Sequence, residues 1–284
     1  MGSLLFTRVF LILGGMLLVT SFAARINKAF ETKTEAVITL VLPFILLFPL
    51  HYYADVYPLN LIFAAAFSFN MGWMIAPGII ALGEQFKWRK YIKNKGIVAK
   101  TVVTKKADWI DKIAGTKDEK HFAYYYKASP ENTFDMKSNE YRKLRDDFNA
   151  EIVSKDPYNQ EWQNVIFQAV LGTTTAVFLA AAANYMLDID FGFLGLFLFI
   201  ALAALVVMRI LNLFIYKSNN LRMLSAYAGV VIFTLYLLFD LNTLEKRIEM
   251  GDESWGTAIR VSVNLYLDII NLFLDLLKIL AEGG

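Results

Sequence analysis

The sequence predicts an all-α membrane protein, a bundle of seven transmembrane helices with a small α+β polar insertion between the third and fourth helices. Of its 284 residues, 57% are hydrophobic and 15% are aromatic. The apolar residues occur in blocks long enough to cross a bilayer. One long polar segment interrupts these blocks and divides the chain into residues 1–84, 85–161 and 162–284.

The overall charge and the cysteine count exclude several classes of function. The formal net charge is only +2, which gives no reason to expect a nucleic-acid partner. The chain has no cysteine, so disulfides, thiolate metal sites and cysteine nucleophiles are excluded.

The seven spans follow from the apolar blocks in chain order. Their predicted limits are 4–24, 34–53, 58–83, 162–187, 192–216, 221–243 and 256–281. Pro58 stands where a helix can begin, and Pro77 predicts a kink within the third span.

The last span differs from the others because it carries a regular set of polar residues. At 100° per residue, six of them fall within an arc of about 80° and extend over about 27 Å of the helix axis. These are Arg260, Asn264, Asp268, Asn271, Asp275 and Lys278. Because the rest of the helix surface is apolar, this stripe is predicted to face the interior of the bundle.

Two aspartates within spans are candidates for function, because a buried ionisable group is costly in a membrane. Asp268 is flanked by apolar turns, and Asp240 follows a long apolar run in the sixth span. A hairpin at about 244–255 can bring both residues to the same depth, where two carboxylates in contact would share a proton. The alternative is that Asp240 reaches the membrane edge and only ends its helix.

Two long motifs near the C-terminus resemble a known family. "VIFTLYLLFDLNTLEKR" and "VSVNLYLDIINLFLDLLKIL" resemble the last two helices of the Bax-inhibitor-motif transmembrane family, whose bacterial members are calcium-leak proteins. Weaker similarity continues in "FNMGWMIAPGI", "IFQAVLGTTTAVF" and "LNLFIYK". The resemblance implies a seventh helix at the centre of the bundle, wrapped by the other six. It does not extend to residues 85–161.

The resemblance also implies a function and its residues. The family's aspartate pair corresponds to Asp240 and Asp268, which would close a calcium path in a pH-sensitive manner. The family's arginine near the end of the second helix is missing from "PLHYYADVYP". His51 is the nearest ionisable substitute as a partner of the gate, although a histidine at a helix end can also simply face lipid headgroups.

The residues around the pair predict weak calcium binding. Asn264, Asn271 and Asp275 would line the path, and together with Asp240 and Asp268 they supply fewer oxygens than a tight calcium site uses. Weak binding suits a conduit, so calcium is expected as the transported ion and no cofactor is expected. Arg209, in the fifth span, is expected to reach the membrane edge rather than the gate.

Two other classes of function compete with a calcium leak. A non-conducting accessory subunit could keep the bundle and dock onto a larger membrane complex through the insertion. Paired aspartates also occur in intramembrane aspartyl proteases, but the Tyr-Asp and Gly-x-Gly-Asp motifs of those proteins are absent here. The sequence therefore favours a protein that is not an enzyme.

The polar insertion shows both a basic segment and elements of a small fold. The stretch 85–106 has eight Lys or Arg and no acid, which indicates contact with anionic lipid at Lys87–Lys106 or a solvated helix extension. "SNEYRKLRDDFNAEIV" predicts an amphipathic helix with Ser138 as its N-cap. Its apolar residues are Tyr141, Leu144, Phe148 and Ile152. They are expected to pack on predicted strands in "IVAKTVVT" and "HFAYYYKA", or on another protein.

The membrane and the orientation are separate questions. A bacterial plasma membrane or a mitochondrial inner membrane is expected. The resemblance puts the N-terminus in the cytoplasm and hence the insertion outside. Basic residues near span ends favour the reverse, because they resist translocation and are more numerous on the side of the insertion. That side carries Arg25, Lys28, Lys33, the 87–95 cluster, Lys217 and Arg222, against Arg8, Lys246, Arg247 and Arg260 opposite.

We follow the charges and predict that the insertion is retained in the cytoplasm or the mitochondrial matrix. Because the chain has no native cysteine, single Ser129→Cys and Ser254→Cys variants can be labelled with an impermeant thiol reagent in intact cells or organelles. The Ser254→Cys variant should be labelled and the Ser129→Cys variant protected. The opposite pattern would show that the orientation implied by the resemblance is correct.

Overall fold

The structure is a computed structural model that describes residues 3–105, 119–187 and 189–283. The chain forms two compact units. The first comprises Met1–Leu82 together with Val165–Gly284, and the second comprises Gly83–Asn164. We call them the bundle and the inserted unit.

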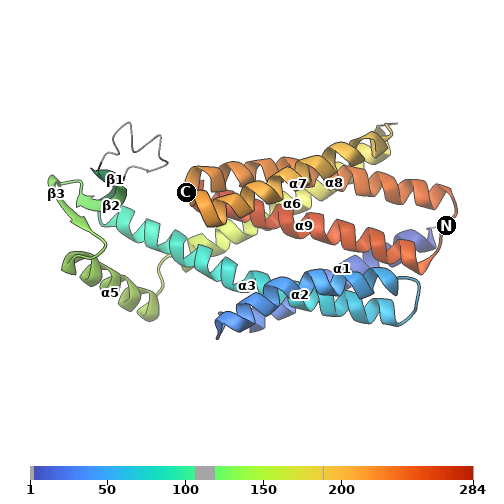
Figure 1. Cartoon of the computed structure of the whole chain (residues 1–284), viewed down its shortest axis with the longest axis horizontal. Coiled ribbons are helices and arrows are strands. Elements are labelled where there is room, and N and C mark those ends of the chain that lie inside the picture. Colours follow the sequence, from blue (N-terminus) through green and yellow to red (C-terminus); the bar gives the residue numbers. More distant parts are fainter. Residues whose placement is uncertain (1–2, 106–118, 188, 284) are drawn as a thin grey trace. The chain divides into compact units, whose positions relative to one another are not determined.

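The predicted helices are all present (Figure 1). They are α1 (Leu4–Ile26), α2 (Lys33–Tyr52), α3 (Leu59–Asn94), α6 (Asn159–Met186), α7 (Leu194–Leu211), α8 (Asn219–Glu249) and α9 (Trp255–Gly283). Two short segments flank α7, the 3₁₀ turn η1 (Phe191–Phe193) and the π-helical turn η2 (Asn212–Tyr216). In the described residues, six segments are long and apolar enough to cross a membrane, namely α1, α2, α3, α6, Phe191–Tyr216 and α8. The chain is therefore a multi-pass membrane protein.

Two helices continue well beyond their predicted limits, and one further span ends in an irregular turn. The third span was expected to end at 83, but α3 continues to Asn94, so part of the basic segment is a helix extension. The sixth span was expected to end at 243, but α8 continues to Glu249. Asp240 therefore lies within a helix and does not end it. The fifth span ends in a π-helical turn, after which Lys217 adopts a left-handed conformation with φ 48°.

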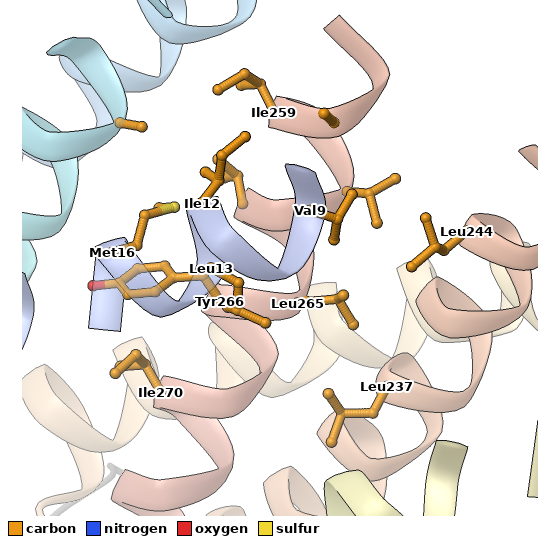
Figure 2. Close-up of a cluster of buried hydrophobic side chains, with 14 of the residues drawn as sticks. Val9, Ile12, Leu13, Met16, Leu237, Leu244, Ile259, Leu265, Tyr266 and Ile270 are labelled. Carbon is orange, nitrogen blue, oxygen red and sulfur yellow. The ribbon is translucent and has the colours of Figure 1, made fainter. Parts of the chain in front are cut away.

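The last helix, α9, is the central element of the bundle. It has buried residues in every turn from Gly256 to Leu277, on more than one face, whereas α2 and α7 bury only three and two residues. A helix that is buried around most of its circumference lies inside a bundle. Figure 2 shows part of this packing, in which side chains of α1, α8 and α9 meet. They include Val9, Ile12, Leu13, Met16, Leu237, Leu244, Ile259, Leu265, Tyr266 and Ile270.

Buried hydrogen bonds join α9 to its neighbours. The Thr20 hydroxyl lies 2.6 Å from the Tyr266 hydroxyl and donates to the Ser68 carbonyl at 3.0 Å, which connects α1, α3 and α9. The Ser262 hydroxyl lies 3.0 Å from the Val9 carbonyl of α1, to which it can donate. Since the bilayer core offers no water, such polar groups must find partners inside the protein.

An ion pair joins α7 to α9. One guanidinium nitrogen of Arg209 lies 2.7 and 2.6 Å from the two carboxylate oxygens of Asp275, and 3.3 Å from the Ser225 carbonyl of α8. The expectation that Arg209 only reaches the membrane edge was therefore wrong. Gly229 of α8 makes room for this pair, because a Cβ there would lie 1.9 Å from a carboxylate oxygen of Asp275.

The inserted unit contains a three-stranded antiparallel sheet in the order β1-β2-β3 and one helix. The strands are β1 (Ile97–Lys105), β2 (Glu119–Tyr126) and β3 (Ser129–Asp135), and the helix is α5 (Asn139–Ser154). The strands predicted in "IVAKTVVT" and "HFAYYYKA" are confirmed as β1 and β2. Strand β3, "SPENTFD", was not predicted, because it lacks apolar alternation and contains Pro130, which suits an edge strand.

The predicted amphipathic helix is confirmed as α5, and its apolar face packs within the same unit. The Ser138 side chain caps it by accepting a hydrogen bond from the Tyr141 amide at 3.1 Å. Leu144 and Phe148 are buried in a largely aromatic cluster, against which Tyr141 and Ile152 also pack. The other buried members are Trp88, Tyr91, Ile92, Ile97, Tyr124, Phe134 and Tyr158.

Several basic residues of the inserted unit have acidic partners. Lys87 pairs with Asp156, Lys90 with Glu161 at 3.1 Å, and Arg145 with Glu84 at 2.8 Å. Lys106, at the end of the expected lipid contact, lies outside the described residues. Contact between this segment and anionic lipid remains a prediction, and part of the segment's charge is balanced within the unit.

The Arg209–Asp275 pair generates a test of packing in the bundle. Replacing Gly229 with alanine should force the pair apart and destabilise the protein by on the order of 1–3 kcal/mol, as overpacking does. Thermal unfolding of the full chain in detergent would report this as a lower Tm. Gly78→Ala is the control, because a Cβ there meets nothing within 4 Å and Ala favours a helix over Gly. Equal Tm values for the two variants would contradict the role of Gly229.

The aromatic cluster generates a test of the inserted unit. Phe148 is 2% exposed, and its ring lies 5.2 Å from that of Trp88 and 5.3 Å from that of Tyr91. Phe148→Ala should cost about 3–5 kcal/mol and make residues 83–164 sensitive to limited proteolysis while the bundle stays intact. Val153→Ala on the same helix, at a residue that is 89% exposed, should leave the proteolysis pattern unchanged. Equal protection in both variants would show that the cluster does not hold the unit together.

Candidate functional site

The structure brings the two predicted aspartates together inside the bundle. Asp240 of α8 and Asp268 of α9 are only 4% and 5% exposed. Their carboxyl groups interact with each other, and the Asn264 side chain interacts with Asp240. Two acceptor groups can form a hydrogen bond only when one of them carries a proton.

The Asp240–Asp268 pair is not fully satisfied by the surrounding protein. One carboxylate oxygen of Asp268, Oδ2, is buried and has no hydrogen-bond partner in the described part of the chain. A buried carboxylate oxygen without a partner is costly, and either a proton or a cation would relieve that cost. Such an atom is a physical reason to regard the pair as a site rather than as packing.

A tyrosine that sequence reasoning missed lies beside the pair. Tyr236 precedes Asp240 by four residues, which places the two side chains on the same face of α8. It stands in the apolar run "VIFTLYLLFD", where the sequence alone does not distinguish a tyrosine at a functional site from one that packs in the core. The spacing of four residues from Asp240 was the one available signal.

The other predicted residues of the stripe have different surroundings. Arg260 and Asn264 are exposed, so the stripe is accessible at its start, whereas Asp268 is buried. The Asn271 amide donates to the Leu267 carbonyl of its own helix at 2.8 Å. Asp275 is held by Arg209. Of the three residues predicted to line a path, Asn264 is therefore accessible, whereas Asn271 and Asp275 already have partners.

Further along α9, the stripe contacts one basic residue of the neighbouring helix α8, Arg222. The Lys278 ammonium donates to the Arg222 carbonyl of α8 at 2.9 Å, and Arg222 pairs with Glu282 at 2.7 Å. The polar stripe thus meets three polar partners in succession along α9. Asp268 meets Asp240, Asp275 meets Arg209, and Lys278 meets Arg222.

His51 lies at a different place. It is an exposed residue at the end of α2, four residues before Asp55, whose carboxylate accepts a hydrogen bond from the Gly256 amide at 2.6 Å. Along α9, Gly256 and Asp268 are about 18 Å apart. In the described residues His51 forms no hydrogen bond or ion pair with either aspartate, so its part in a gate remains a prediction without a contact to support it.

The described residues contain no group of three or more His, Asp or Glu side chains placed to hold a metal ion together. Two carboxyl groups and one amide oxygen are fewer ligands than a tight calcium site uses. Weak calcium binding at Asp240 and Asp268 remains a prediction.

Comparison with known proteins locates the similarity in the C-terminal part of the chain. Residues 158–284 match the family described as "Inhibitor of apoptosis-promoting Bax1". Among similar proteins, Protein LIFEGUARD 4 of Arabidopsis thaliana is 39% identical over 110 residues, which is 39% of this chain and 41% of that protein. The Golgi anti-apoptotic protein of vaccinia virus is 33% identical over 117 residues, 41% of this chain and 47% of that protein.

A bacterial relative extends the match slightly. An uncharacterized protein of Helicobacter pylori is 31% identical over 130 residues, which is 45% of this chain and 51% of that protein. The chain thus spans about half or less of the length of the relatives it matches. Both aspartates of the candidate site lie within the matched residues 158–284. Through these residues, the comparisons support the assignment of the chain to the Bax-inhibitor-motif transmembrane family.

Proposed function

We propose that this protein is a pH-sensitive calcium leak whose path is closed by the contact between Asp240 and Asp268. The observation that carries the proposal is the pair itself, two buried carboxyl groups on neighbouring helices with one buried oxygen left without a partner. The resemblance to the Bax-inhibitor-motif transmembrane family supports it, because bacterial members of that family are calcium-leak proteins.

Loss of the shared proton would open the path. While one carboxyl group is protonated, it can donate to the other and hold α8 against α9. Once both are ionised they repel each other, since two like charges in contact repel by roughly 4 kcal/mol at an effective dielectric constant near 20. The contact then separates or takes up a cation. A higher pH on the side from which the pair is reached would therefore favour conduction, and a lower pH would close it.

The stripe of α9 provides a route to the pair from one end. Arg260 and Asn264 are exposed, and Asn264 also reaches Asp240, so an ion that passes the exposed turns meets the pair next. Beyond it, the Arg209–Asp275 ion pair joins α7 to α9 and forms a second barrier that an ion would have to pass. A weak site followed by a barrier is consistent with a slow leak rather than with storage of calcium.

Two alternatives make different predictions from the same fold. The inserted unit has its own core, which is the feature that would suit an accessory subunit docked onto a larger complex. An intramembrane protease would also use two aspartates, but would cleave a transmembrane substrate. In each case the purified chain would not conduct calcium. The membrane in which it works, bacterial plasma membrane or mitochondrial inner membrane, stays a prediction.

Calcium flux into liposomes that contain the purified chain, measured across a range of pH, tests this proposal. Wild-type flux should rise with pH, whereas Asp240→Asn and Asp268→Asn should change the flux and flatten its pH response, because neither variant can form the charged pair. Asp146→Asn removes an exposed carboxylate on α5 and should keep the wild-type pH profile. Absence of flux in the wild type, or an unchanged pH profile in both aspartate variants, would refute the proposed gate.

A further inference from the structure

A groove of about 370 Å³ lies between α1 and α3, away from the aspartate pair. Its walls are apolar and include Leu11, Gly15 and Val19 of α1 and Leu61 and Ala65 of α3. The three residues of α1 follow one another at intervals of four, so they line a track of about 12 Å along the helix axis. The volume falls within the range of about 300–1,000 Å³ that small-ligand sites occupy.

One end of the groove is charged and aromatic. The Arg8 guanidinium lies 4.4 Å from the ring centre of Trp255 and also donates to the Glu253 carbonyl. The Trp255 ring in turn lies 5.1 Å from that of Tyr57. Arg8 is in the second turn of α1, Trp255 begins α9, and Tyr57 precedes α3, so the three mark one end of the bundle. Tryptophan, tyrosine and arginine at helix ends are typical of the interface between membrane and water.

The described residues leave the charge of Arg8 without a counterion. Within residues 3–105, 119–187 and 189–283, no acidic side chain forms an ion pair with it. Its known partners, a carbonyl and an aromatic ring, use only part of a guanidinium that has five N–H donors. An anion at this end of the groove would therefore find both charge and free donors.

The groove is also open on its outer side. Leu11 is 71% exposed, and a Cβ at Gly15 would meet nothing within 4 Å. Since α1 and α3 are membrane-spanning helices, the medium outside the groove is the hydrocarbon of the bilayer. An apolar track that starts at the Arg8 cation near the membrane–water interface is complementary to a phospholipid, in which an acyl chain lies below a phosphate.

We propose that this groove is a binding site for an anionic phospholipid, with one acyl chain along the Leu11–Gly15–Val19 track and the phosphate at Arg8. A second copy of the chain fits less well. A symmetric dimer through the groove would bring two Arg8 side chains together without an acidic partner for either. The proposal concerns α1 and α3 and stands independently of the calcium leak.

Two adjacent glycines supply a matched pair of variants. Gly15 lines the groove and Gly14 does not, yet a Cβ at either would meet nothing within 4 Å. Gly15→Leu should fill the groove without disturbing the fold, and Gly14→Leu should add the same side chain to the same helix outside it. Arg8→Gln removes the charge, and Arg8→Lys keeps it.

Lipid binding can be measured by native mass spectrometry of the full chain in detergent with added phosphatidylglycerol and phosphatidylcholine. The wild type should prefer phosphatidylglycerol by about fivefold, as an interaction of about 1 kcal/mol gives. The preference should persist in Gly14→Leu and Arg8→Lys and fall to about one in Arg8→Gln. Gly15→Leu should bind little of either lipid at this site.

Three results would overturn the proposal. The first is equal binding of the two lipids by the wild type, and the second is wild-type binding by Gly15→Leu. The third is a dimer that Gly15→Leu dissociates and that carries no lipid, which would identify a second copy as the occupant. Thermal unfolding of each variant shows whether it is folded. If Arg8→Gln is unfolded, the comparison of Gly15→Leu with Gly14→Leu still decides the question.

Discussion

The fold depends on one constraint, that a polar group in the bilayer core must be paired inside the protein. This constraint explains why the helix with the most regular polar stripe, α9, is also the one most enclosed by others. Three buried polar residues of this helix each meet a partner on a specific helix. Tyr266 meets α1, Asp268 meets α8 and Asp275 meets α7. The stripe thus positions the surrounding helices as much as apolar packing does.

The two buried aspartates of α9 have partners of opposite charge type, one a base and the other an acid. Asp275 faces a guanidinium, which stays charged at any physiological pH, so that contact is permanent. Asp268 faces another acid, and a hydrogen bond between two carboxyl groups requires a proton on one of them. Gly229 shows how closely the permanent contact is fitted, because even a methyl group there would occupy the position of the carboxylate. One helix therefore carries a fixed contact and a conditional one, two turns apart.

The sequence predicted those features that depend on local periodicity. The 3.6-residue repeat of α9 places Asp268 and Asp275 on one face, and Ser138 with Leu144 and Phe148 defines α5. Contacts that depend on relative depth were not predictable. Arg209 was assigned to the wrong surroundings because its depth depends on how α7 passes through the π-helical turn into α8. Strand β3 was missed because it is held by pairing with β2 and not by its own pattern.

The same constraint bears on how α9 is held in the membrane. It is not among the six segments that qualify as spans by length and composition, and it carries Arg260, Asp268, Asp275 and Lys278. A charged residue at the centre of an isolated helix costs about 2.5–3.5 kcal/mol on insertion scales, and α9 has Asp268 near its centre and Asp275 two turns further on. Its residence in the bilayer therefore depends on the partners supplied by α7 and α8. The position of a helix held in this way depends on the charge of its partners. A proton-controlled contact between α8 and α9 requires this dependence.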